Sequence, residues 1–124
     1  MPRKLLSGQG WRLGWDPEAE QFCGLLGGEC WAVELTAVEL RDFCNAAQSL
    51  GRTMAAMSEQ LMAEERLTCE QETETVWLEA EGLPSQYSLR FILLTGRRGE
   101  GEWPATALPG LLEAAEKTIN QLSL

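Results

Sequence analysis

The sequence contains no histidine, no closely spaced cysteine pair and no long apolar run. Histidine is the side chain most often used for proton transfer near neutral pH and for binding transition metals. Its absence excludes a Ser-His-Asp triad or a Cys-His pair within one chain, so an enzyme would depend on carboxylates, tyrosine, lysine or a cofactor. We therefore expect a non-enzymatic protein without a cofactor, and an unrecognised enzyme ranks third among the functions considered.

The four cysteines are too widely spaced for a structural zinc site. They lack a C-x2-C clamp, and no histidine can complete a tetrahedral ligand set. A 124-residue chain with 44% hydrophobic residues can bury a sizeable core without disulfides. We expect free thiols, and we place Cys44 in the core because it lies on an apolar helix stripe. Cys23 and Cys30 flank a predicted hairpin and could approach each other, while Cys69 lies on a predicted strand.

Positive charge is scarce, because ten Lys and Arg residues stand against nineteen Asp and Glu, giving a net charge of −9. Such a chain repels phosphate and anionic lipid on average, which disfavours nucleic-acid and membrane binding. A local cationic strip could still survive that average, because salt screens distant charges. The basic and then apolar start, residues 1–7, is too short for a secretory signal, and no run approaches the roughly 20 residues that span a bilayer. We therefore expect a cytoplasmic protein.

The first half of the chain predicts three antiparallel strands followed by a helix. Apolar and polar residues alternate in short segments separated by turn residues, as in half-buried strands. Thr36-Ala37-Val38-Glu39 fits a capping box, and apolar residues then recur at spacings of three and four to about Met62. Gly51 interrupts the middle of that stripe. The expected strands are residues 11–15, 21–26 and 30–35.

The second half repeats this order. Its expected strands are residues 66–73, 75–81 and 87–95, and residues 97–102 are expected to form a hairpin tip. Trp103-Pro104 restricts the chain to extended geometry, which leaves a fourth strand open, and Pro109 suits the first turn of a closing helix.

The sequence thus predicts one α+β domain over residues 1–124, with two halves that each consist of an antiparallel sheet and a helix. The repeated order suggests an internal duplication of residues 9–62 and 66–123. Chance identities in glycine-rich turns are the alternative explanation. A constant shift superimposes Gly24 on Gly96, Gly27 on Gly99, Trp31 on Trp103 and Leu40 on Leu112.

Five tryptophans are a high number for this length, and all lie on predicted strands. If exposed, they would form a stacking platform for unpaired bases, with nearby arginines contacting phosphates. We favour the other interpretation, in which they anchor the strands to the helices in the core. The tryptophans are Trp11, Trp15, Trp31, Trp77 and Trp103, and the arginines are Arg12, Arg90, Arg97 and Arg98.

Glutamates recur at every second residue from Glu70 to Glu74, which places them on one face of a strand. Glu79 and Glu81 could extend this acidic ladder, unless the intervening turn changes the face on which they lie. It could dock a basic protein partner or hold a divalent cation weakly, although a plain solvated face that discourages aggregation is the simpler interpretation. We predict no catalytic, cofactor or metal residues. The candidate interaction residues are Glu70, Glu72, Glu74, Trp11, Trp15, Arg97 and Arg98.

Three segments, Gly10–Pro17, Gly27–Thr36 and Gly101–Pro104, resemble a small uncharacterised family of cyanobacteria and plastids over nearly the whole chain. That family is similar in fold to the Whirly and positive-cofactor-four type of regulators that bind single-stranded DNA. The resemblance implies strand-rich sheets that are each followed by a helix. It also implies a regulator of transcription as one function to consider.

One departure from the Whirly pattern matters. Whirly proteins carry the motif Lys-Gly-Lys-Ala-Ala-Leu on an early strand, which residues 30–35 do not match, and Glu29 and Glu34 lie where cations would be expected. No DNA-binding residue is therefore carried over. We predict an acidic module for protein interaction or regulation with an unknown protein partner. A regulator that binds single-stranded nucleic acid is the alternative, and homo-oligomerisation is left open.

Overall fold

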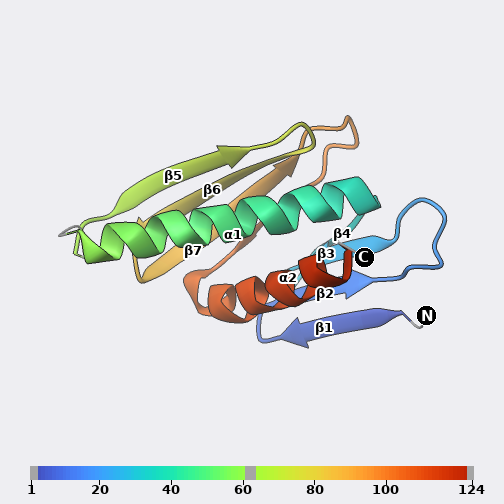
Figure 1. The fold of residues 1–124 in the computed structure, drawn as a ribbon, viewed down its shortest axis with the longest axis horizontal. Coiled ribbons are helices and arrows are strands. Elements are labelled where there is room, and N and C mark those ends of the chain that lie inside the picture. The colour runs from blue at the N-terminus through green and yellow to red at the C-terminus, as the bar shows by residue number, and fades with distance from the viewer. Residues whose placement is uncertain (1–2, 61–63, 123–124) are drawn as a thin grey trace.

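Two four-stranded antiparallel sheets, each followed by a helix, make up the computed structural model, which describes residues 3–60 and 64–122 (Figure 1). The first half contains β1 (Lys4–Gly8), β2 (Trp11–Trp15), β3 (Gly24–Gly27), β4 (Ala32–Leu35) and α1 (Ala37–Glu59). The second contains β5 (Leu67–Glu72), β6 (Val76–Leu83), β7 (Gln86–Leu93), β8 (Glu100–Trp103), a 3-10 turn (Ala105–Ala107) and α2 (Leu108–Leu122). Among the described helices, none is both long and apolar enough to cross a membrane.

The predicted α+β class with two sheet-plus-helix halves is confirmed, but the first sheet has one strand more than we expected, and the second has the fourth strand that the sequence left open. β1 was missed because most of its side chains are exposed, which hides the alternating pattern. β8 begins at Glu100, inside the segment expected to be a hairpin tip, and residues 94–99, with a bend at 95–97, connect it to β7. The first half also starts before residue 9. The predicted helix end near Met62 lies outside the described residues.

Both sheets are simple meanders, in which each strand pairs with its neighbours in sequence. The register aligns Leu13 with Leu6 on one side and with Leu26 on the other, so these leucines share the inner face of the first sheet. In Figure 1, α1 runs across the second sheet and α2 across the first, and the two helices also contact each other. The order of four strands and a helix occurs twice; descent from a duplication stays a prediction.

The capping box at the start of α1 forms as predicted. The Glu39 backbone N–H donates to Thr36 Oγ1 (3.2 Å), and the Thr36 N–H donates to Glu39 Oε1 (2.8 Å). Behind it, the apolar stripe of α1 is buried between the sheets and α2. Cys44 is fully buried in this stripe, which confirms its core role, and burial raises the pKa of its thiol to about 12.

An aromatic cluster joins the two halves of the molecule. Trp103 of β8 is fully buried, and its ring centroid lies 5.0 Å from that of Trp31 and 5.5 Å from that of Phe91. The Trp103 indole N–H donates a 3.0 Å hydrogen bond to the carbonyl oxygen of Gly27, so the second sheet is bonded to the first. The Trp31 ring covers Gly101 so closely that a side chain there would overlap it. Packing at this junction thus requires a glycine inside β8.

Replacing Gly101 by alanine tests this packing. The G101A methyl group would overlap the Trp31 ring, so we expect a loss of about 1–3 kcal/mol in the free energy of unfolding, measured in urea. Gly51 is the matched control, because a methyl group there would meet its neighbours at an ordinary 3.7 Å. G51A should stabilise the helical segment by about 0.4–1 kcal/mol. Equal effects of the two substitutions would contradict the proposed role of Gly101.

Candidate functional site

The predicted interaction residues do not gather on one surface. Trp11 and Trp15 lie on the inner side of β2 and pack against the core, and the Trp11 indole lies between Gly8 of β1 and Gly110 of α2. Trp31 and Trp103 belong to the junction described above. Four of the five tryptophans therefore support the interpretation as core anchors. The fifth, Trp77, does not.

Trp77 lies on the outer face of the second sheet, the face opposite α1. The register places it between Glu72 and Ile92, and its ring is partly exposed. The Arg90 guanidinium lies 5.6 Å from the centroid of the Trp77 ring, and the indole N–H points to Glu70 Oε2 at 3.4 Å. An aromatic and an aliphatic side chain therefore form the centre of a sheet face that α1 does not cover.

Carboxylates surround this centre on three strands. Glu70 and Glu72 are exposed on β5, and Glu79 is on the same face because it pairs directly with Glu70. Glu74 is exposed in the turn after β5 and lies beyond the ladder. The sequence did not reveal that β8 adds two more glutamates. We call this surface the acidic face; it consists of Glu70, Glu72, Trp77, Glu79, Glu81, Arg90, Ile92, Glu100 and Glu102.

The charges of the acidic face are poorly balanced. Glu70 and Glu79 are direct cross-strand neighbours of like charge, an arrangement that destabilises a sheet. In the strand register, Arg90 lies opposite Glu79 on one side and opposite Glu102 on the other. Arg66, just before β5, forms a 2.7 Å ion pair with Glu81. The face therefore has a strongly negative potential around its apolar centre.

Arg97 holds parts of the fold together, although 33% of its side chain stays exposed. Its guanidinium forms an ion pair with Glu39, donates a 2.6 Å hydrogen bond to the Glu34 carbonyl oxygen and lies 4.6 Å from the centroid of the Phe22 ring. The Thr95 hydroxyl donates to the other Glu39 oxygen at 2.5 Å. The β7–β8 turn is thereby fastened to α1 and β4. Arg98, its neighbour, is exposed and has a positive φ of 56°.

Among the described residues, no three side chains of the His, Cys, Asp and Glu types are grouped to hold a metal ion.

The outer side of the first sheet has a hollow of about 540 Å³, which Phe22, Leu25 and Cys23 help to line. Burial, opposed by a backbone hydrogen bond and aided by the negative charge of Asp16, raises the pKa of the Cys23 thiol. A thiol with a raised pKa is a poor nucleophile. All four cysteines are free thiols.

Comparison with known proteins supports the fold and leaves the activity open. Residues 6–118 match the model of a family described as a domain of unknown function, DUF1818. A protein of unknown function from the cyanobacterium Prochlorococcus sp. NATL2A, assigned to the DUF155 family, is 29% identical and superimposes with a TM-score of 0.87. The match covers 94% of this chain and 98% of that protein. No curated protein is detectably similar to this chain.

The contacts of Glu39 with Arg97 and Thr95, which we call the Arg97 clamp, make the free energy of unfolding depend on pH. Burial raises the pKa of Glu39, but hydrogen bonds from Thr95 and Thr36 and the charge of Arg97 outweigh burial and hold the pKa below its ordinary 4.5. This stabilisation is complete above pH 4.5 and disappears as the pH falls through the lower, folded-state pKa. At pH 7, E39Q should therefore lower the free energy of unfolding by about 1.5–3 kcal/mol.

The measurement is urea unfolding of the wild type and E39Q between pH 7 and pH 3. The difference between the two proteins should shrink as the pH falls below 4.5. E59Q is the control, because Glu59 is exposed on the last turn of α1, and it should follow the wild type at every pH. A difference between E39Q and the wild type that stays constant with pH would contradict this assignment.

Proposed function

Because the chain belongs to the DUF1818 family, whose function is unknown, we propose a role from its surface: a non-enzymatic interaction module that binds a basic protein through the acidic face. The observation that carries this proposal is the Trp77–Ile92 pair, which lies partly exposed between glutamates on an uncovered sheet face. Stable protein interfaces commonly have an apolar, aromatic centre with a polar rim. The acidic face has both parts.

The distribution of charge specifies the kind of partner. Six glutamates and one arginine occupy the face, so an approaching basic surface is attracted and an acidic one is repelled. Trp77 can contribute buried area and cation–π contacts with arginine or lysine, as it already does with Arg90. Lysines and arginines around a small apolar patch are therefore the expected features of the partner.

Folding alone gives no reason for the direct Glu70–Glu79 pair. A lysine at either position would relieve the repulsion, and it would blunt the β5 edge equally well. A feature that lowers stability on an exposed face is expected where binding requires it. This argument favours a docking surface over a plain solvated face.

E70K separates stability from binding. The introduced ammonium group would lie opposite Glu79, so we expect thermal and urea stability to rise by up to about 1 kcal/mol. The same change should abolish capture of a basic partner from lysate, measured by affinity purification and mass spectrometry after nuclease treatment. E59K is the matched control: it changes the net charge equally, lies at the end of α1 and should retain the partner.

Two results would contradict the docking proposal. One is capture of the same proteins by E70K and by the wild type. The other is a loss of captured proteins with E59K as large as that with E70K, because net charge alone would then explain the interaction. Loss of capture accompanied by unfolding is detected by the stability measurement on the same sample.

A second candidate is a regulator that binds single-stranded nucleic acid, as the resemblance to Whirly-type proteins implies. The twice-repeated order of four strands and a helix supports this candidate. The chemistry of the surface opposes it, because Trp11, Trp15 and Trp31 pack against the core and Arg97 is held by Glu39. Phosphate contacts supply most of the non-specific affinity for nucleic acid.

Titration with labelled single-stranded oligonucleotides distinguishes the two candidates. We expect weak binding at low salt and none at physiological salt, because the net charge of −9 disfavours a polyanion. Fluorescence anisotropy of the oligonucleotide is the readout. Tight binding whose logarithm falls steeply with the logarithm of salt concentration would reverse the order of the two candidates.

A further inference from the structure

The free edge of β1 is the second unusual surface. β1 pairs only with β2, and four of its five residues are exposed. Leu5 is 59% exposed, which is high for a leucine in a strand. Exposed edges invite pairing with another strand unless charge, proline or a covering element prevents it. On β4, at the other edge of this sheet, Arg97 already binds the Glu34 carbonyl oxygen.

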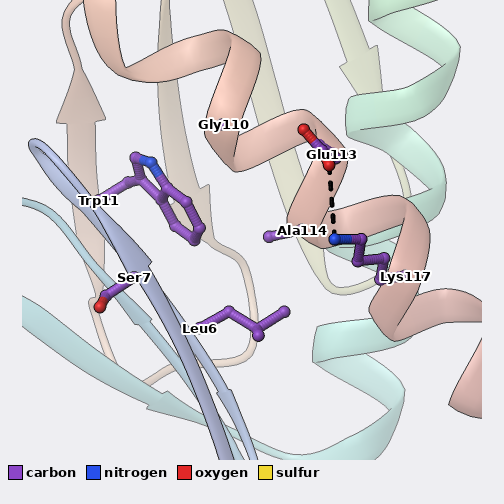
Figure 2. A pocket seen from close by; sticks show the side chains of 7 residues that line it. All are labelled: Leu6, Ser7, Trp11, Gly110, Glu113, Ala114 and Lys117. Carbon is purple, nitrogen blue, oxygen red and sulfur yellow. Dashed lines mark ion pairs between the residues drawn. The ribbon is translucent and has the colours of Figure 1, made fainter.

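Beside this edge, β1 and α2 enclose a hollow of about 250 Å³, shown in Figure 2. Leu6 and the Trp11 indole form its apolar wall. Glu113 and Lys117 of α2 line the hollow; they form a 3.4 Å ion pair and keep 68% and 65% of their side chains exposed. Strand backbone, an apolar wall and one charge of each sign therefore lie together.

We propose that this edge binds the same edge of a second copy of the chain. The two β1 strands would run antiparallel about a two-fold axis at Leu6, so that the two four-stranded sheets become one continuous sheet. A two-fold interface must be complementary to itself. The backbone, the apolar residues and the charges of the β1 edge each meet this condition.

The backbone register is self-complementary. Gly8 and Trp11 close a two-residue turn, so their backbone groups face each other, and in an antiparallel ladder Leu5 and Ser7 then point theirs away from β2. With the axis at Leu6, Leu5 of each copy pairs with Ser7 of the other. Both outward-facing residues are thereby bonded. Lys4 falls opposite Gly8 of the other copy, so the two lysines stay apart.

Side chains on the inner side of the sheet agree with this register. Leu6 would meet Leu6 of the second copy, and the two apolar hollows would join across the axis. The β2 strands of the two copies would be three strand spacings, or ~14 Å, apart. α2 contacts both β1 and β2, so the two α2 helices would be close enough for long side chains to touch. Glu113 of one copy would then face Lys117 of the other.

Charge exchange tests this contact directly. Sedimentation velocity should show a wild-type dimer, and E113K or K117E alone should weaken dimerisation about tenfold or more, because like charges then face each other. An equimolar mixture of E113K and K117E should recover wild-type dimerisation, since opposite charges face each other only in the mixed dimer. The ion pair within α2 stays broken in both variants, so recovery cannot come from restored helix stability.

S7P tests the backbone pairing. The Ser7 N–H points away from β2, so proline removes a bond between copies and none within the chain. S7P should be monomeric, with wild-type circular dichroism and the thermal stability that the wild type shows when diluted to the monomer. S7A, which keeps the N–H, should stay dimeric. A monomeric wild type at every concentration would overturn the proposal. So would a dimer that S7P does not weaken, or a charge-exchange mixture that behaves like its components.

Discussion

The rest of the structure depends on the seam between the two sheets. Trp103 is buried there, bonds the Gly27 carbonyl and packs on Trp31 and Phe91, so each sheet supplies part of the other's core. Each half has one helix, and that helix packs mainly on the sheet of the other half, so neither half alone covers the inner face of its own sheet. Joining the inner faces around α1 and α2 solves this problem and leaves other surfaces, including the acidic face and the β1 edge, toward solvent.

Contacts near the same seam also engage two of the arginines in bonds within the fold. Arg97 turns inward to Glu39 and to the edge of β4, and Arg12 donates hydrogen bonds to the carbonyl oxygens of Gly28 and Trp31. With only ten cations in the chain, each internal use leaves the surface more acidic. The negative potential of the acidic face thus follows partly from how the fold is held together.

The sequence predicted what local patterns encode: the capping box, the α1 stripe and the alternation in β5. It left open the face on which Glu79 and Glu81 lie, which the pairing of β5 with β6 decides. It failed where a long-range contact decides. β8 contains Gly101 because Trp31 packs on it, and the glycine made this strand look like a turn. The clamp between Arg97 and Glu39 joins residues 58 positions apart, and no spacing rule could reveal it.

The two proposed surfaces differ in charge in the way that their occupants require. A chain of net charge −9 repels its own copies, so self-association needs an edge where few acidic groups meet. The β1 edge meets this need, because Arg3 and Lys4 lie at its start and Glu113 is paired with Lys117. The acidic face lies on the other sheet and stays available. A dimer would carry two such faces, and two linked weak contacts can bind one extended basic partner far more tightly than either contact alone.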